Sequence, residues 1–356
     1  MHKNFAKALK DIDVALSIKA DLMPAYVLLI SIHKAGGERA DKVDAINRAL
    51  KLFPRSFLVW SNSLRTMEPR WGGSYAAMEN FAKQAEPHFD ANPFLSALYG
   101  FIYYDQAKIF DAQEKYQDAV TLYSRALEYG DHPDFYFGRA ETYHFKLDEP
   151  AKALADVNRC IVLRPADADD YRLRSRIKFK LDSLEDSLDD LRVAVRLRPG
   201  DQSNQTWMEW ASKNLVNRGH RVYQQNPDQA VQWYSHALEF NAVNSEAYYW
   251  RAVVNYQRSQ FEKAQTDLDR AIEFNPRHFE SYLLMDHVLL LQKNFDTIIA
   301  YWDRFLELEP THARAYLERA GTYRHKGDPS KSLADLKRSC ELGNAEACKY
   351  LEKQKQ

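Results

Sequence analysis

A short apolar motif returns along this chain at a nearly fixed interval. Its first residue is usually alanine, the next residue is apolar, and another large apolar side chain follows three positions after the first. Most steps between copies are 34 residues, and the two irregular steps of 77 and 43 are whole periods plus nine. A fixed period of this length indicates stacked copies of one small unit, each of which contacts only its neighbours. The first residues of the copies are Ala15, Ala49, Ala126, Cys160, Ala194, Ala237, Ala271, Phe305 and Ser339.

Residues 245–276 show the unit most clearly. Both halves of this segment carry apolar residues at helical spacing, with a break at Ser259 and Gln260. Pro276 ends the second half, because proline cannot continue the helical hydrogen bonds and restricts the residue before it. With only 12 glycines and 13 prolines in 356 residues, the chain lacks the turns of an all-β fold. The pattern therefore predicts an all-α fold built from helix-turn-helix units.

This unit resembles the tetratricopeptide repeat. Counting from Ser245 as position 1, the residues that carry the resemblance are Ala252 at position 8, Phe261 at 17, Ala264 at 20, Ala271 at 27 and Pro276 at 32. The resemblance implies a right-handed superhelical solenoid of helix pairs. It covers most of the chain, in units at 23–54, 55–91, 92–132, 133–165, 166–199, 200–242, 245–276, 279–310 and 313–342.

Four regions follow from these units. Residues 1–22 are expected to be the second helix of a repeat whose first helix is missing, which predicts a truncated native N-terminus. Residues 23–91 form the N-terminal repeats, and 92–342 form the main array. Residues 343–356 are expected to form a capping helix.

Two positions of the unit change together within this one chain. Wherever position 7 is arginine, position 23 is aspartate, and units that lack the arginine also lack the aspartate, as with Met285 and Tyr301. We therefore predict that the two positions touch within each helix pair and that the ion pairs are structural, not catalytic. The predicted pairs are Arg139 with Asp156, Arg174 with Asp190, Arg251 with Asp267, and Arg319 with Asp335.

The period breaks before two long first helices, expected at about 92–113 and 204–225. The second carries Trp207 and Trp210, which either form a contact surface or cover a neighbouring helix. A Gly-Gly turn follows Trp71, which is either a packing anchor or part of a binding site. The surrounding stretch is similar to a bacterial domain of unknown function, which suggests a bacterial source and implies no activity.

The three cysteines are too few for a disulfide framework, and Cys160 occupies a core position of the repeat. Cys340 and Cys348 have the spacing found in Sel1-like repeats of exported bacterial proteins, in which the pair is bridged. Two free thiols that pack a turn remain the alternative. A bridge would indicate a periplasmic or secreted protein, whereas a cytoplasmic location is the default without one.

Composition and motifs exclude several kinds of function. The net charge is −1 and no basic run is present, which argues against nucleic acid as a partner. No apolar stretch approaches the length of a membrane span, so direct membrane insertion is not expected. No nucleophile elbow, dinucleotide fingerprint or cluster of metal ligands is found, so we predict no enzyme activity, no cofactor and no metal.

The resemblance implies binding of another protein or peptide in a groove lined by the first helices. Positions 2, 5, 9 and 12 or 13 of the unit face that groove in tetratricopeptide arrays. The alternatives are that these residues fill a tight superhelix, or that the chain is a structural scaffold in a bacterial envelope or secretion complex. The carboxylate clamp of chaperone-binding members is absent. The predicted groove residues are aromatic, basic or histidine: Tyr104, Phe137, Arg172, Arg176, Phe179, Tyr249, Tyr256, His287 and Arg324.

Overall fold

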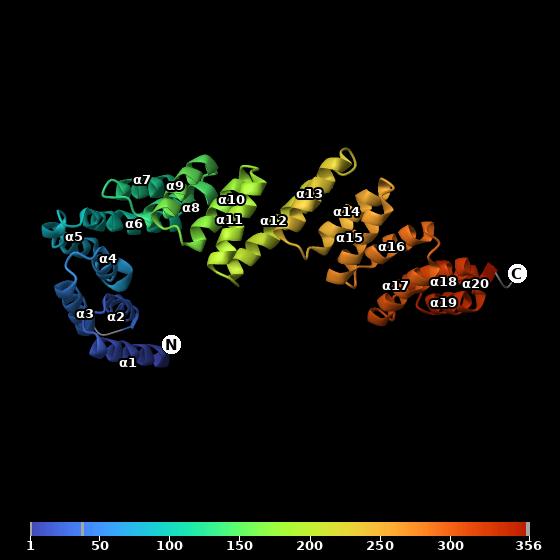
Figure 1. Cartoon of the computed structure of the whole chain (residues 1–356), viewed down its shortest axis with the longest axis horizontal. Helices are drawn as coiled ribbons and strands as arrows, with labels where there is room; N and C mark the ends of the chain where they lie inside the picture. Colours follow the sequence, from blue (N-terminus) through green and yellow to red (C-terminus); the bar gives the residue numbers. More distant parts are fainter. Residues whose placement is uncertain (1, 37–38, 354–356) are drawn as a thin grey trace. The chain divides into compact units, whose positions relative to one another are not determined.

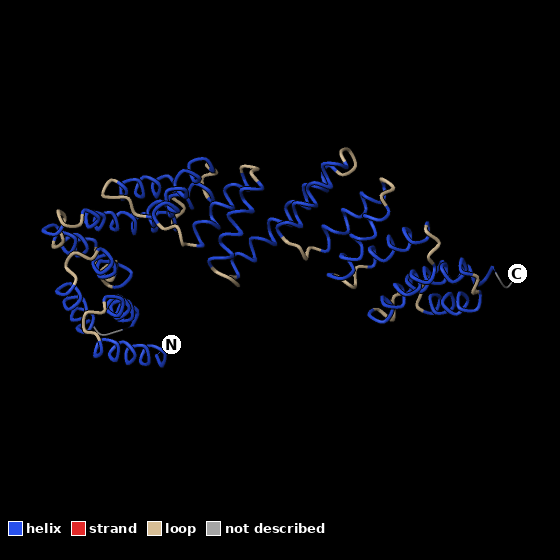
Figure 2. Tube along the Cα trace, viewed as in Figure 1, coloured by secondary structure: helices blue, strands red, loops and turns tan. Residues whose placement is uncertain are grey.

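The computed structural model describes residues 2–36 and 39–353, and along these residues the chain contains helices but no strands (Figures 1 and 2). The predicted all-α fold of adjacent helix pairs is confirmed. The chain divides into two compact units, unit 1 at 1–199 and unit 2 at 200–356. Their boundary falls at the second break in the period and is not among the region boundaries that the repeat pattern predicts.

Unit 1 contains the first eleven α-helices and three short 3-10 helices. They are α1 (His2–Ile18), α2 (Met23–Gly36), α3 (Arg39–Leu52), α4 (Phe57–Arg65), η1 (Pro69–Trp71), α5 (Tyr75–Lys83), η2 (Glu86–His88), η3 (Pro93–Ser96), α6 (Ala97–Ala112), α7 (Tyr116–Leu127), α8 (Pro133–Phe145), α9 (Pro150–Leu163), α10 (Ala168–Lys180) and α11 (Leu184–Leu197).

Unit 2 contains four helix pairs and a terminal helix. The helices are α12 (Gln202–Val222), α13 (Pro227–Phe240), α14 (Ser245–Gln257), α15 (Phe261–Phe274), α16 (Phe279–Leu291), α17 (Phe295–Leu308), α18 (Ala313–Lys326), α19 (Pro329–Glu341) and α20 (Ala345–Lys353).

Within each unit, the two helices of each pair pack against each other, and the second helix also packs against the next pair. From Ala49 onward, the residue that marks the repeat is buried in the core of every copy. In unit 1, α2, α4, α6, α8 and α10 contact one another in chain order, and in unit 2 the same holds for α12, α14 and α16. We call the surface that these helices share the first-helix face. It is the face that a tetratricopeptide groove would use.

The structure refines two of the expected helices. The first break in the period does not begin with one long helix: Asn92 caps a 3-10 turn at Pro93–Ser96, and α6 follows at Ala97. The second long helix is α12, whose 21 residues begin at Gln202 under an Asp201 cap. On α12, Trp207 is buried while Trp210 stacks on it and stays exposed, with ring centroids 5.0 Å apart.

A left-handed backbone conformation recurs two residues before the second helix of six pairs. Only one of the six residues is glycine, and the other five have a positive φ that side chains with a Cβ rarely adopt. The repeat therefore imposes the same tight turn on unrelated side chains. The six are Glu114, Asp148, Asp182, Ser259, Lys293 and Gly327.

We expect glycine at these turns to stabilise the array. Because Ser259 has φ 58° and Lys293 has φ 57°, Ser259→Gly and Lys293→Gly should each raise the free energy of unfolding by about 0.5 kcal/mol, the relieved strain exceeding the added chain entropy. Gly327→Ala should lower it by a similar amount. Urea titration monitored by circular dichroism measures the change. Gln257→Gly, at the last helical residue of α14, two positions before Ser259, is the control and should destabilise.

Candidate functional site

Four basic side chains gather on the first-helix face of unit 1. We call Lys34, Arg65, Arg70 and Lys108 the cation cluster; they come from α2, the end of α4, η1 and α6. Two carboxylates lie among them, Glu68 at 1% exposure and Asp105 at 4%. These six side chains hold two more positive than negative charges. Arg65 also lies 3.8 Å from Asp134, a carboxylate that is shared with Arg164.

Glu68 and Asp105 are held by the two arginines. Arg70 Nε donates to Glu68 Oε2 at 2.8 Å, and Arg70 Nη2 lies 3.6 Å from Asp105 Oδ1. Arg65 Nε lies 3.5 Å from Glu68 Oε1. The buried carboxylates are therefore matched by the arginines, and the two lysines account for the excess positive charge.

The two lysines of the cluster are the residues whose charged form is destabilised by their surroundings. Burial lowers the pKa of Lys108, and the nearby Arg70 and Arg65 lower it further. Burial also lowers the pKa of Lys34, with Glu68 opposing and the other three cations adding to the effect. Neither lysine forms an ion pair with another described residue. A cavity of about 370 Å³ is lined by Arg70, Asp105 and Lys108. Such a site favours an anion, because an added negative charge relieves the repulsion among the cations.

The turn after Trp71 sets the position of Arg70. Gly72 adopts φ +80°, and a Cβ on Gly73 would lie 2.0 Å from the carbonyl oxygen of Met67. Both glycines are thus required by the fold. Trp71 is 41% exposed, and Lys34 Nζ lies 5.2 Å from its ring centroid. Trp71 therefore borders the cation cluster and is not part of the core.

Aromatic side chains continue the same surface along α6 and α8. Lys108 lies over the Tyr104 ring at 5.4 Å, and Arg65 lies over the Phe101 ring at 5.8 Å. Tyr104 is half-buried, and burial raises its pKa to about 12. Phe137 is half-buried beneath Arg164, whose Cζ lies 5.3 Å from the ring centroid. The cation cluster thus adjoins partly exposed rings, a combination typical of binding surfaces.

On α10, two of the predicted groove residues reach the surface and one does not. Arg172 pairs with Asp169, and Arg176 lies over the exposed Phe145 ring at 5.7 Å. Burial and the nearby Arg172 lower the pKa of Arg176. Phe179, which we expected to line the groove, is only 4% exposed. Its position in the unit turns it into the core, so it is removed from the candidate surface.

The predicted groove residues of unit 2 lie on α14, α16 and α18. Tyr249 and Tyr256 are half-buried on α14, where Tyr249 packs against His278 at 4.8 Å. His287 is exposed on α16. Arg324 is exposed on α18 and lies over the Tyr350 ring at 5.6 Å.

The four predicted ion pairs all form within their helix pairs. Each arginine binds its aspartate through Nε and Nη2, with the following Nη2–Oδ1 distances: Arg139–Asp156 2.7 Å, Arg174–Asp190 2.6 Å, Arg251–Asp267 2.7 Å and Arg319–Asp335 2.8 Å.

The structure adds a third partner that the covarying positions did not reveal. Each Nη1 donates to a polar side chain on the second helix of the preceding pair, at Ser124, Asn158, Ser235 or Asp303. One arginine thus joins two consecutive pairs, and its role is to hold the array together.

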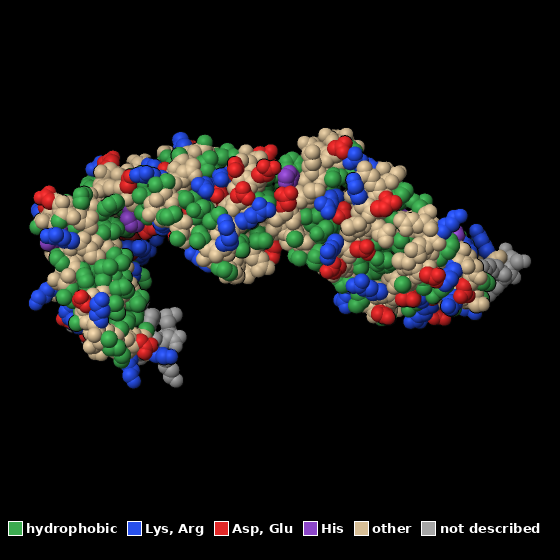
Figure 3. Space-filling view, in the orientation of Figure 1, with side chains coloured by type: hydrophobic (Ala, Val, Ile, Leu, Met, Phe, Trp, Pro, Cys, Tyr) green, Lys and Arg blue, Asp and Glu red, His purple; other side chains and the backbone are tan. Residues whose placement is uncertain are grey.

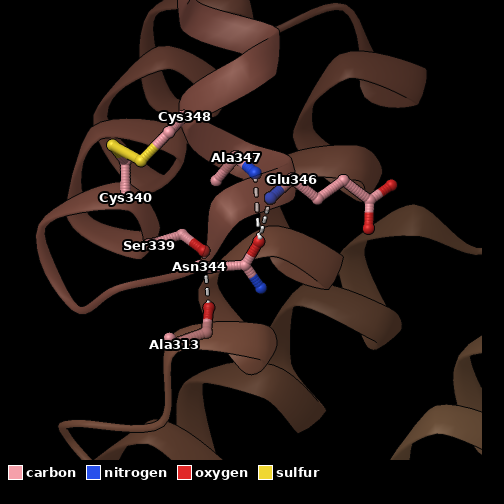
Figure 4. Close-up of a disulfide and its surroundings, with 7 residues drawn as sticks. All are labelled: Ala313, Ser339, Cys340, Asn344, Glu346, Ala347 and Cys348. Atoms are coloured by element: carbon pink, nitrogen blue, oxygen red, sulfur yellow. Dashed lines mark hydrogen bonds between the residues drawn. A yellow bond between two sulfur atoms is a disulfide. The ribbon is translucent and has the colours of Figure 1, made fainter.

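Cys340 and Cys348 are joined by a disulfide between the end of α19 and α20, with Cα atoms 4.8 Å apart (Figure 4). The Asn344 side chain accepts hydrogen bonds from the backbone of Glu346 and Ala347, both at 3.0 Å, and so caps α20. Ser339 Oγ donates to the Ala313 carbonyl at 2.7 Å, which ties this turn to α18. Cys160 is a buried free thiol, and burial raises its pKa well above the ordinary value.

Within the described part of the chain, no group of three or more His, Cys, Asp or Glu side chains is placed to hold a metal ion. None of the described helices has the length and apolarity required to cross a bilayer. Basic and acidic side chains are interspersed over the face drawn in Figure 3.

Two segments of the chain, residues 104–169 and 220–283, match the family model of the tetratricopeptide repeat. They contain α7, α8, α9, α13, α14 and α15 whole and parts of the adjoining helices. No curated protein matches the chain in sequence.

Solved structures of tetratricopeptide proteins are similar at low identity. YrrB, described as having an unusual peptide-binding site, is 22% identical; the match covers 55% of this chain and 97% of that one, with a TM-score of 0.34. The first tetratricopeptide domain of Spaghetti (RPAP3), bound to an HSP90 peptide, is 23% identical over 33% of this chain and 92% of that chain, with a TM-score of 0.31. Yeast Tom70 is 15% identical over 99% and 93% of the two chains, with a TM-score of 0.36.

Proposed function

We propose that this chain is a non-catalytic scaffold that binds a partner protein through an acidic peptide segment laid on the first-helix face of unit 1. The observation that carries the proposal is the cation cluster, in which Lys108 is half-buried and positive charges exceed the carboxylates. The adjoining rings of Tyr104 and Phe137 supply apolar contact area next to that charge. The tetratricopeptide match to residues 104–169, which include both rings, supports the same use of the face.

The excess positive charge of the cation cluster favours an acidic peptide. Burial lowers the pKa of Lys34 and Lys108, and the neighbouring cations add to this; a carboxylate beside the two lysines would offset both effects. Aromatic or aliphatic side chains on either side of that carboxylate would lie on the exposed part of the rings. Electrostatic complementarity of this kind sets specificity and the association rate more than total affinity. Binding should therefore weaken as salt is added.

The test uses a fluorescein-labelled ten-residue peptide of alternating Glu and Phe, and a matched peptide with Gln in place of Glu. We expect fluorescence anisotropy to show binding of the acidic peptide only. Lys34→Met with Lys108→Met should weaken binding about tenfold or more, which corresponds to about 1.4 kcal/mol. These substitutions leave the arginine–carboxylate pairs in place, so the fold should persist.

Lys83→Met is the matched control, because Lys83 is an exposed lysine of the same unit that lies outside the cation cluster. It should leave the affinity unchanged. Equal binding of the Glu and Gln peptides, or equal affinity of the wild type and the double variant, would refute the proposal.

The disulfide bears on where the protein works. Because such bridges persist in oxidising compartments, we infer that the chain acts in one, as the Sel1-like spacing implies. Thiol titration of the purified, denatured protein should then count one reactive thiol, from Cys160. Three reactive thiols in protein taken directly from its native cell would exclude this location.

A further inference from the structure

A second cavity of unit 1, of about 510 Å³, lies between α5 and α6. Its lining residues include Tyr75 and Glu79 of α5, Tyr99 and Tyr103 of α6, and Tyr129, which follows α7. With 3.6 residues per turn, Tyr99 and Tyr103 fall on the side of α6 opposite Tyr104 and Lys108. The cavity therefore lies on another side of α6 from the cation cluster, and Tyr75 links the two through its hydrogen bond to Asp105.

The rings of Tyr99, Tyr103 and Tyr129 contact one another in series. Tyr103 and Tyr129 stack with centroids 5.6 Å apart and an interplanar angle of 14°, and Tyr99 lies 5.7 Å from Tyr129. Arg125 already lies over the Tyr103 ring, its Cζ 5.4 Å from the centroid. One ring of the set thus carries a cation in the structure.

The hydroxyl groups of Tyr75 and Tyr99 donate hydrogen bonds to carboxylates that do not line the cavity. Tyr75 donates to Asp105 Oδ2 at 3.1 Å, and Tyr99 donates to Glu86 Oε1 at 2.6 Å. Donation to a carboxylate increases the electron density of a phenol ring, which strengthens its attraction for a cation. Burial and the nearby Glu86 raise the pKa of Tyr99, so this hydroxyl stays protonated and remains a donor.

The charge of the lining is negative. Glu79 is its one ionised side chain, and the described residues form no ion pair with it. Glu86 lies beside Tyr99. Lysine and arginine are absent from the lining residues, although Arg125 lies over the Tyr103 ring, with its Nε 4.0 Å from Glu128 Oε2.

We propose that this tyrosine cavity binds an organic cation, either a free quaternary ammonium compound or a basic side chain of a partner peptide. Four aromatic rings around one unpaired carboxylate provide the two interactions that such a group needs: ring faces for its apolar surface and a formal negative charge. The cavity volume suits a ligand of small-molecule size.

The test is isothermal titration of the whole chain with tetramethylammonium chloride, with tert-butyl alcohol as the neutral ligand of similar shape. We expect the cation to bind and the alcohol not to bind. Nα-acetyl-arginine amide distinguishes the source: tighter binding than tetramethylammonium indicates a peptide side chain, and weaker binding indicates a free quaternary ammonium compound. Equal binding of the alcohol, or absence of binding by both cations at 50 mM, would overturn the proposal.

Variants assign the site. Tyr99→Leu and Glu79→Gln should each weaken cation binding by about threefold or more, whereas Tyr99→Phe, which keeps the ring, should retain most of it. Arg125→Gln should strengthen binding, because it removes a competing positive charge from the Tyr103 ring. Tyr350→Leu, in unit 2, is the control. Should Tyr99→Leu lose its helical circular dichroism, the site is judged from Glu79→Gln, which should weaken binding, and Arg125→Gln, which should strengthen it. A change in the reverse direction, or no change, in either of these variants would contradict the site.

Discussion

Replacing Asp267 with alanine is expected to lower the free energy of unfolding by about 2 kcal/mol. Arg251 binds Asp267 through two nitrogen atoms, and the aspartate side chain is 7% exposed. Removing one partner of a buried pair leaves the other charge without its counterion, which costs about 3–5 kcal/mol when burial is complete. The Arg251 side chain is 24% exposed, so hydration of its charge would reduce that loss of stability. Urea denaturation followed by circular dichroism measures the difference.

The chain itself supplies the matched control for this experiment. In the next pair, Met285 and Tyr301 occupy the two positions and belong to one hydrophobic cluster. The double substitution Arg251→Met with Asp267→Tyr should therefore come within about 1 kcal/mol of the wild type, since apolar pairs commonly replace buried ion pairs without loss. A double variant that is as unstable as Asp267→Ala would show that the ion pair is not interchangeable with the apolar pair.

Stability should fall as the pH rises from about 4 to about 6, because of Asp286. This residue occupies the position where the repeat has a small side chain, and it is 8% exposed. Burial raises its pKa from 3.8 to about 6, with Glu318 adding to the rise and Trp302, His287 and His325 opposing it. The folded state therefore binds the proton more tightly than the unfolded state. The stabilisation is complete below the unfolded pKa and is lost as the pH rises through the folded pKa.

The size of this effect follows from the shift in pKa. Each unit corresponds to about 1.4 kcal/mol, so the loss is about 3 kcal/mol. Asp286→Asn should keep the acceptor for Trp302 Nε1, which donates to Asp286 Oδ2 at 2.7 Å. The variant should be more stable than the wild type at pH 7.5 by about 2–3 kcal/mol and about equally stable at pH 4. Parallel urea titrations at the two pH values measure this. Identical pH profiles of the two proteins would show that Asp286 is not the group responsible.

The repeat pattern predicted the helix pairs well where it was regular. Residues 245–276 become α14 and α15, with the turn at the expected break, and the arginine and aspartate positions that change together meet in space. The pattern failed where the period broke. At 55–91 the sequence predicts one degenerate unit, whereas the structure has two short α-helices and two 3-10 turns.

The candidate site could be predicted only in part. Tyr104 and Phe137 follow from their positions in the unit, because those positions recur on one face of each first helix. Arg65 and Arg70 were missed, since they lie in the degenerate segment 55–91, where no repeat position could be assigned. Lys34 was missed although it stands at position 12 of the unit 23–54, because a repeat position alone does not show which other charges the side chain meets. The pairing of the charges around Glu68 depends on contacts among α2, η1 and α6, which are far apart in the chain. Phe179 was misplaced because a repeat position gives the side of a helix only to within one neighbouring residue.

The amino-acid sequence by itself determined the paired helices, their period and the contacts inside each pair, because these depend on residues at most about 30 positions apart and on a pattern copied many times. The tertiary structure alone decided which charges gather at Glu68, which tyrosines surround the cavity beside α5, and how each arginine joins two pairs. Those arrangements depend on how segments without a shared pattern pack against one another, and the free energy of that packing is a property of the neighbours that each side chain acquires on folding.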